Sequence, residues 1–357
     1  MHRVTRWLWA SRAPSARVTR LALLPPSIFY RFVASLRARA YGSRLLPVGI
    51  PTVPTIAVGN LTVGGSGKTP LSSWIARYYA DRGMRSAIVL RGYGGDEGEV
   101  HRRHLPQVIV VEDPDRLAAA RTAVARGAQV IVMDDAYQRL DVGRDLNIAV
   151  VSAESSRAVR WTLPAGPWRE GWPALRRADL VVVTRKWASL DTALSTAQRA
   201  HQVAPHAKFA VAHLGLSGFR ELLSDTPVAL GALNGARVVA GAGIADPDAF
   251  ARQCRAIGAH VHLVPFPDHH RYGERDIRRL LHGRQAVDYV VVTEKDAVKL
   301  RSRWPAGAPE PLVAQLGLEW DRGEATVGTA LDAAVGELTG LWNPDPNPGG
   351  GTTADLR

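Results

Sequence analysis

Short apolar runs alternate along the first half of the chain with segments whose apolar residues recur every three or four positions. The short runs predict buried strands, and the longer segments predict amphipathic helices. We expect helices at 71–82, 114–126 and 190–203, the second of them capped by Asp113. We expect strands at 55–58, 86–90, 130–133, 146–151, 180–183 and 208–214. This alternation predicts an α/β fold.

The same pattern restarts after a stretch of weak periodicity. We expect a linker or hinge at 215–236, between a first domain at 45–214 and a smaller α/β lid domain at 237–340. The Pro- and Gly-rich end at 341–357 predicts a disordered tail. Within the smaller domain we expect helices at 247–257 and 274–281, and strands at 238–241, 261–264 and 289–292.

The N-terminal segment, residues 1–44, is basic and rich in aromatic and aliphatic residues. The chain has a net charge of +12, and no Asp or Glu precedes Asp81. No apolar run is long enough to span a bilayer. Two interpretations stay open: a basic amphipathic segment on an anionic membrane surface, or a helix packed on the body of the protein. Nucleic acid is the weaker partner class, because no zinc-finger or RNA-recognition signature is present.

A glycine-rich stretch follows the first strand and leads into a helix. Glycines let the backbone wrap around phosphate oxygens, and the helix N-terminus adds positive charge. This context predicts a nucleotide-binding phosphate loop, although Thr62 stands where the usual motif has glycine. Lys68 would reach the β- and γ-phosphates, and the Thr69 hydroxyl would bind Mg²⁺. The loop is Thr62, Val63, Gly64, Gly65, Ser66, Gly67, Lys68 and Thr69.

Acidic residues follow two of the predicted strands. Asp134 and Asp135 end the strand at 130–133, as expected for the Mg²⁺-holding half of a phosphate-loop site. Asp96 lies beyond the strand at 86–90, where it would act as a base, a metal partner or a solvated acid. In a shaped loop, Arg169 would meet a phosphate and Glu170 a metal or hydroxyl, or the two would form a surface ion pair.

Lysine and cysteine usage add two smaller observations. Arginine supplies most of the positive charge, so a retained lysine is a candidate for a site that needs a compact ammonium. The single cysteine, Cys254, excludes an internal disulfide framework. The run Asp268-His269-His270 lacks an evident third ligand, so zinc is not expected. The five lysines are Lys68, Lys186, Lys208, Lys295 and Lys299.

Together, these motifs resemble the tetraacyldisaccharide 4′-kinases of lipid A biosynthesis. The likeness covers about residues 50–300 and includes the family's own phosphate-loop form, with Thr62 in place of the first glycine. It departs after Asp135, where Ala136, Tyr137 and Arg139 replace the family's Gly, Phe and His. The motifs span 59–70, 91–94, 134–138, 163–170, 266–270 and 293–299.

The resemblance implies a P-loop NTPase-like α/β/α sandwich with a second, smaller α/β domain that closes on it. It implies transfer of the γ-phosphoryl group of ATP, with Mg²⁺, to the 4′-hydroxyl of tetraacyldisaccharide 1-phosphate. We expect a peripheral, monomeric enzyme on the cytoplasmic face of the inner membrane of a Gram-negative-type cell. The implied residues are Asp96 and His269 for catalysis, Thr69, Asp134, Asp135 and Glu170 for Mg²⁺, and Asn60, Arg91 and Arg169 for substrate.

Other phosphate-loop functions remain as alternatives. One is a kinase of a soluble small molecule, for which residues 1–44 would be dispensable. Another is a nucleotide-hydrolysing switch without an acceptor, and a third is a catalytically silent relative. GTP preference is not supported, because Lys295 directly precedes Asp296, without the intervening residue of a guanine-reading loop.

Overall fold

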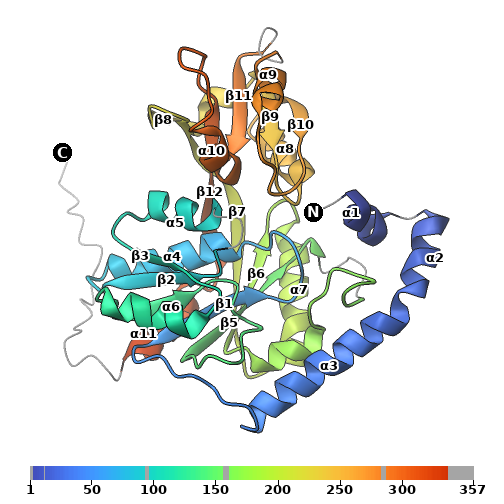
Figure 1. The fold of residues 1–357 in the computed structure, drawn as a ribbon, viewed down its shortest axis with the longest axis vertical. Coiled ribbons are helices and arrows are strands. Elements are labelled where there is room, and N and C mark those ends of the chain that lie inside the picture. The colour runs from blue at the N-terminus through green and yellow to red at the C-terminus, as the bar shows by residue number, and fades with distance from the viewer. Residues whose placement is uncertain (1–2, 12, 93–95, 156–160, 283–286, 337–357) are drawn as a thin grey trace, which may run out of the picture.

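One continuous sheet runs through the whole molecule (Figure 1). The computed structural model describes residues 3–11, 13–92, 96–155, 161–282 and 287–336. The sheet has 12 strands, and its described pairs are parallel except those of β7 with β12 and with β8. Along the sheet the order is β10 (His260–Pro265), β9 (Arg237–Ala242), β11 (Tyr289–Thr293), β12 (Leu312–Arg322), β7 (Lys208–Glu221), β6 (Leu180–Arg185), β5 (Leu146–Ser152), β1 (Thr55–Asn60), β4 (Val130–Met133), β2 (Ser86–Leu90) and β3 (Ile109–Glu112), with β8 (Pro227–Val228) on β7.

The large unit, formed around strands β1 to β6, has helices on both faces of its sheet. On one face α4 (Lys68–Ala80) and α11 (Glu324–Val335) cover a core of side chains from β1, β2, β4 and β5. On the other face lie α6 (Arg116–Ala125) and α7 (Leu190–Val203). Helix α5 (Asp96–His104) and the 3₁₀ helix η2 (Trp172–Arg177) complete the unit. The predicted α/β/α sandwich is therefore confirmed.

The small unit forms the upper part of the molecule in Figure 1. Its strands β9, β10 and β11 are covered by α8 (Pro247–Ala256) on one face. On the other face lie α9 (Glu274–His282) and α10 (Glu294–Leu300). Helix α11 lies within the range expected for this domain, but it packs on the large unit, where Tyr79 Oη donates to Leu331 O at 2.8 Å.

The two units are joined by the long strands β7 and β12. Strand β7 continues to Glu221, seven residues beyond the predicted end at Leu214, so the first part of the expected linker is strand. The antiparallel pairing with β12 extends from Val211 to Glu221 and explains this continuation. A short 3₁₀ helix, η3 (Leu230–Leu233), follows. The domain limits themselves stay a prediction, and residues 337–357, including the expected tail, lie outside the described residues.

Each predicted strand and helix is present, with small shifts at its ends except in β7, whereas β3, β12, α5, α10 and α11 were not predicted. The cap of α6 is one difference. The carboxylate of Asp115, and not that of Asp113, accepts hydrogen bonds from Leu117 N at 2.9 Å and Ala118 N at 3.1 Å. Asp113 Oδ1 instead accepts from Asp115 N at 2.7 Å, in the turn before the helix.

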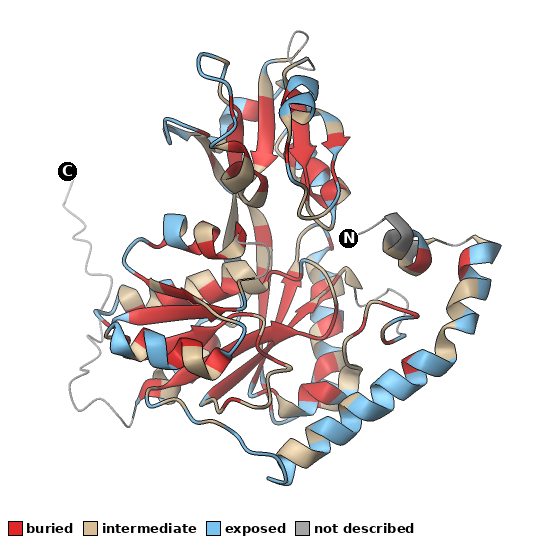
Figure 2. Ribbon diagram, viewed as in Figure 1, coloured by how far each residue is buried: buried red, intermediate tan, exposed pale blue. Residues whose placement is uncertain are grey.

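The N-terminal arm, residues 3–42, consists of three consecutive helices beside the large unit (Figure 1). They are α1 (Arg3–Ala10), α2 (Pro14–Ala22) and α3 (Leu24–Gly42). Buried Ser27 attaches α3 to the body, since its hydroxyl donates to Thr162 O and accepts from Ala165 N, both at 2.9 Å. Figure 2 shows that α2 and α3 are otherwise largely exposed. Within the described ranges, no helix is both long and apolar enough to cross a membrane.

Candidate active site

The predicted phosphate loop joins the end of β1 to the start of α4. Strand β1 is fully buried between β4 and β5, so the loop emerges at the carboxyl end of the sheet. Gly64 and Gly67 have φ angles of 121° and 90°, which favour glycine. A Cβ atom at position 67 would also lie 2.3 Å from Leu214 Cδ1. Backbone conformation therefore requires glycine at positions 64 and 67, and close packing requires it at 67 as well.

Polar side chains hold the loop backbone in place. Asn60 Nδ2 donates to Ser66 Oγ at 2.7 Å, and Thr184 Oγ1 donates to Ser66 O at 2.7 Å. Lys186 Nζ donates to Gly65 O at 2.8 Å. Asn60, which we expected to contact substrate, therefore contacts the loop itself.

Lys68 lies at the start of α4 and points toward the end of β4. Its ammonium donates to Asn60 Oδ1 at 3.1 Å and pairs with Asp135 Oδ1 at 3.1 Å. Arg169 Nη1 reaches the same Asp135 oxygen at 2.8 Å. Burial raises the pKa of Asp135, but Lys68 and Arg169 outweigh it and hold that pKa well below its usual range. The structure thus brings four of the predicted site residues together.

Asp134 is buried and faces His101, which is not among the predicted site residues. His101 Nε2 lies 3.4 Å from Asp134 Oδ2, and His101 Nδ1 lies 2.9 Å from Ser73 Oγ on α4. Burial acts to raise the pKa of Asp134, while His101 and then Lys68 lower it, with a net downward shift. His101 therefore links α5, α4 and the end of β4. Its position on a short polar helix gave no sequence signal.

Glu170 and Arg169 do not form the surface ion pair that we left open. Both Glu170 oxygens accept from Arg177 Nη2, at 2.9 and 2.7 Å, and Glu170 Oε2 also accepts from Gln138 Nε2 at 3.1 Å. Arg169 turns instead to Asp135. Arg91 lies exposed immediately after β2, and the adjoining predicted motif residues 93–95 lie outside the described residues.

The donor set at the end of β4 fits Mg²⁺. In the described part of the chain, no three His, Cys, Asp or Glu side chains form a metal-binding cluster. Mg²⁺ in kinase sites usually takes one or two carboxylates together with phosphate oxygens and waters. Asp135, whose side chain is 36% exposed, and the Thr69 hydroxyl at the first turn of α4 offer such oxygens. All three acidic residues are paired, Asp134 with His101, Asp135 with Lys68 and Arg169, and Glu170 with Arg177, but Asp135 is the most exposed of them.

A second cluster lies where the two units meet. Asp96 begins α5 of the large unit and is 1% exposed. Its Oδ2 atom lies 3.2 Å from His269 Nδ1, 173 residues away in the chain, and 3.0 Å from Lys299 Nζ. Burial acts to raise the pKa of Asp96. The positive charges of Lys299, then Lys295 and His269, lower this pKa by more, so the net shift is downward. The two residues expected to act in catalysis thus lie together.

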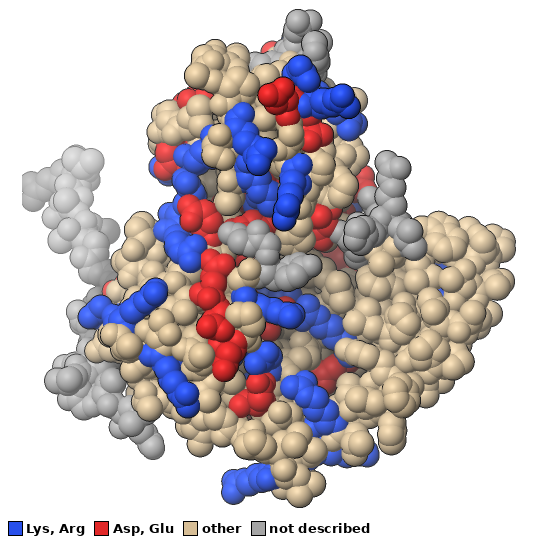
Figure 3. All heavy atoms as spheres, viewed as in Figure 1, with Lys and Arg blue, Asp and Glu red and all other residues tan. Residues whose placement is uncertain are grey.

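Two further charge pairs connect α5 to α10 of the small unit. Lys295 Nζ lies 2.5 Å from Glu97 Oε1, and His104 Nε2 lies 2.5 Å from Glu294 Oε1. Figure 3 shows acidic and basic side chains gathered at this junction. No sequence pattern predicts these pairs, although the scarcity of lysine makes Lys295 and Lys299 candidate site residues.

Two other features lie apart from these contacts. Arg139, which replaces the family's histidine, pairs with Asp141 at 3.1 and 2.8 Å.

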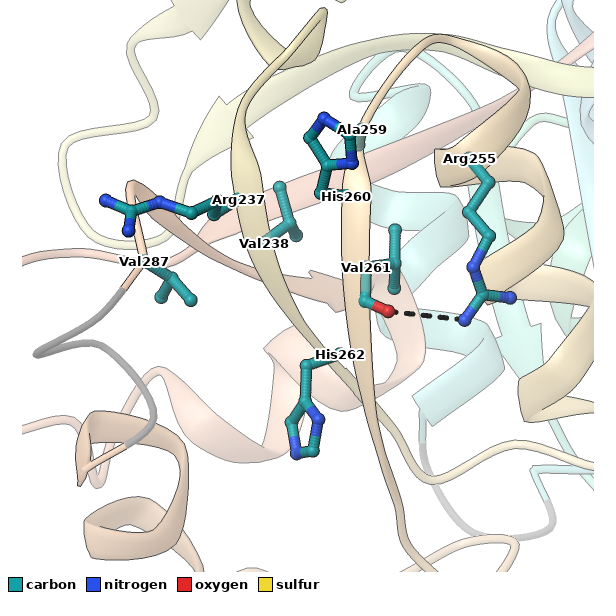
Figure 4. A pocket seen from close by; sticks show the side chains of 8 residues that line it. All are labelled: Arg237, Val238, Arg255, Ala259, His260, Val261, His262 and Val287. Atoms are coloured by element: carbon teal, nitrogen blue, oxygen red, sulfur yellow. Dashed lines mark hydrogen bonds between the residues drawn. The ribbon is translucent and has the colours of Figure 1, made fainter.

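A concavity at the outer edge of the small unit surrounds the start of β10 (Figure 4). Its lining includes Arg237, His260 and His262, and none of its residues belongs to the predicted site.

Comparisons with known proteins agree with this geometry. The sequence profile of the family described as Tetraacyldisaccharide-1-P 4′-kinase matches residues 19–103 and 95–335. The Tetraacyldisaccharide 4′-kinase of Anaeromyxobacter sp. (strain K) is 35% identical, over 95% of this chain and 96% of that protein. The one from Geobacter sulfurreducens is 38% identical, over 80% and 86%.

Among solved structures, the fold is similar to that of LpxK from Aquifex aeolicus, crystallised in complex with ATP. The TM-score is 0.71 at 24% identity, over 89% of this chain and 99% of that one. The likeness to this structure supports the fold, and the sequence matches extend over nearly the whole chain. The chain therefore belongs to the tetraacyldisaccharide 4′-kinase family.

Proposed function

We propose that this protein is an ATP-dependent kinase that phosphorylates the 4′-hydroxyl of tetraacyldisaccharide 1-phosphate. The observation that carries the proposal is the pairing of Asp96 with His269 at 3.2 Å in a chain that also has a phosphate loop. The loop supplies a nucleotide site, and a buried carboxylate held by two units supplies a base for an acceptor hydroxyl. The relatives named above carry the same activity in their names.

The loop side would position the nucleotide and neutralise its charge. The N–H groups of residues 64–69 and the N-terminus of α4 would bind phosphate oxygens. Lys68, now paired with Asp135, would shift toward the β- and γ-phosphates. Bound Mg²⁺, held by Asp135 and Thr69, would supply further positive charge to the transferring group. Arg169 would keep Asp135 ionised and oriented.

Asp96 and His269 would activate the acceptor hydroxyl. Asp96 would accept the proton of the 4′-hydroxyl as the hydroxyl oxygen bonds to the γ-phosphorus. The bond from that phosphorus to the bridging oxygen would break, and ADP would leave with the electron pair. Among the described residues, Asp96 Oδ1 has no hydrogen-bond partner, so it is the oxygen available for this proton. His269 would orient the carboxylate through Oδ2.

The N-terminal arm would bring the enzyme to its acylated substrate. Helix α3 exposes several large apolar side chains, and contiguous apolar surface of this kind marks interaction sites. Arginines on the same helix would meet anionic headgroups. We therefore propose that the arm lies on the cytoplasmic face of the inner membrane. Its exposed apolar residues include Ile28, Phe29, Phe32, Val33 and Leu36.

A transfer assay tests the proposed activity. The full chain would be incubated with Mg²⁺, γ-labelled ATP and tetraacyldisaccharide 1-phosphate in detergent. We expect label on the lipid, with phosphorus NMR locating it at the 4′ position. ATP loss without labelled lipid would contradict the proposal and favour a nucleotide-hydrolysing switch. Transfer to another acceptor would identify a different kinase.

A vesicle assay tests the membrane proposal. Phe29→Ser/Phe32→Ser should weaken binding of the full chain to anionic vesicles, because two exposed side chains no longer insert. Leu194→Ser, an exposed apolar change on α7, serves as a control. Equal binding by the double variant and the control would contradict a membrane-binding arm.

A further inference from the structure

We propose that Lys299 is a positioning residue for the transfer reaction, which fixes the Asp96 carboxylate and directs its second oxygen to the acceptor. The proposal rests on the proposed function. It adds a residue from the small unit to the Asp96–His269 pair. Its basis is the contact between α10 and the first residue of α5.

The geometry of the carboxylate is the first argument. Lys299 Nζ and His269 Nδ1 lie 3.0 and 3.2 Å from the same oxygen, Oδ2 of Asp96. The ion pair with Lys299 and the hydrogen bond with His269 both fall on Oδ2, so they restrict rotation of the carboxylate and leave Oδ1 without a hydrogen-bond partner among the described residues. We therefore assign Oδ1, which is buried and unpartnered among the described residues, to the acceptor hydroxyl. The side chains of Asp96 and Lys299 are only 1% and 17% exposed, so water screens their attraction weakly.

The charges around Asp96 distinguish Lys299 from the other cations near this carboxylate. Lys295 also lies on α10, but its ammonium is paired with Glu97 at 2.5 Å. His269 approaches from the loop after β10. Burial alone would raise the pKa of Asp96 and favour the protonated acid, which cannot accept a proton. Lys299 makes the largest opposing contribution to that pKa.

Lysine usage in the whole chain supports the same assignment. Four of the five lysines lie at the two halves of the site: Lys68 at Asp135, Lys186 at the loop, Lys295 at Glu97 and Lys299 at Asp96. Only Lys208, at the exposed start of β7, contributes to neither half. A compact ammonium approaches one carboxylate oxygen and leaves the other accessible, whereas a guanidinium tends to engage both. The side chain at position 299 is therefore suited to this arrangement.

The pH dependence of catalysis gives a readout that a merely structural lysine would not move. In Lys299→Met we expect the acidic limb of the kcat/KM profile to move up by on the order of one pH unit or more. Lys299→Arg should keep the limb near its wild-type position, and Lys295→Met should move it less. Unchanged ATP affinity would show that each variant is folded. If Lys299→Met does not fold, Lys299→Gln takes its place.

A limb that stays in place in Lys299→Met, or that moves equally in Lys295→Met, would overturn the proposal. A second measurement separates its failure from failure of the proposed function. The carbon-13 signal of the Asp96 carboxyl, assigned with Asp96→Asn, would be titrated without lipid in the wild type and in Lys299→Met. A higher pKa in the variant supports Lys299 even if no lipid is phosphorylated. An unchanged pKa of Asp96 refutes the role of Lys299, whether or not the lipid is phosphorylated.

Discussion

The two halves of the site are built in different ways. The loop half lies within one unit: Lys68 contacts Asn60 and Asp135, and every contact of the loop described above comes from the large unit. The acid half, which consists of Asp96, His269 and Lys299, is assembled across the two units, since Asp96 of the large unit contacts His269 and Lys299 of the small unit. Nucleotide binding should therefore survive separation of the units, whereas activation of the acceptor should not. Such an arrangement would keep Asp96 ionised and oriented only where the two units meet, and would thereby limit wasteful ATP hydrolysis.

The largest effect is expected in the loop half. Lys68→Ala should lower phosphoryl transfer by roughly 10²–10³-fold or more, because the charge on the transferring phosphoryl loses a preorganised donor. Both kcat and ATP affinity should fall, as measured by transfer kinetics and ATP titration. Lys208→Ala, an exposed lysine away from the site, is the matched control. A variant at position 68 with wild-type kinetics would show that the loop is not a phosphate site.

A smaller and more selective effect is expected in the acid half. His269→Gln should lower kcat by about 10–100-fold, because Asp96 loses an orienting partner, while ATP affinity stays unchanged. The neighbouring His270→Gln is the control, because His270 pairs with Asp276 at 3.0 Å and not with Asp96. Equal losses of kcat in His269→Gln and His270→Gln would contradict a specific role of His269 in orienting Asp96.

The smallest effect concerns the junction itself. Contact with Glu294 raises the pKa of His104 in the folded state, so this pair stabilises the protein below the unfolded pKa of about 6.5. The stabilisation is lost as the pH rises through the higher folded pKa. Glu294→Gln should therefore cost roughly 1–2 kcal/mol of unfolding free energy at pH 6 and less at pH 8.5, measured by denaturant unfolding.

Glu99→Gln is the control for the junction. Glu99 pairs with Arg102 and Arg103 within α5, and those guanidinium groups do not titrate in this range. Its effect on stability should be nearly the same at both pH values. A Glu294→Gln loss that is equally independent of pH would contradict a charged His104–Glu294 pair.

The comparison also shows which features the sequence could predict. The strands at 86–90 and 130–133 have the predicted ends, because their apolar runs are buried in a parallel sheet. The phosphate loop is a contiguous stretch with a mechanism, so it could be recognised directly. Asp96 and His269 came together only through the family resemblance, since no local pattern links residues 173 apart.

Other features required the tertiary structure. Helices α5 and α10 are short and polar, so hydrophobic periodicity did not reveal them. Strand β7 continues through Gly215, Ser217 and Gly218, which are poor strand formers, because its pairing with β12 outweighs their local preference. The contacts of Glu170 with Arg177 and of Asp134 with His101 likewise depend on how separate elements meet.

The measurement that tests the central claim most directly compares Asp96→Asn with the wild type. Both proteins would be assayed for label transfer from ATP to tetraacyldisaccharide 1-phosphate and titrated with ATP. We predict that the variant binds ATP as tightly as the wild type and transfers the label about 10²–10⁴-fold more slowly, because only the acceptor half has lost its base. Transfer at the wild-type rate, or loss of ATP binding together with transfer, would contradict a site made of two separable halves.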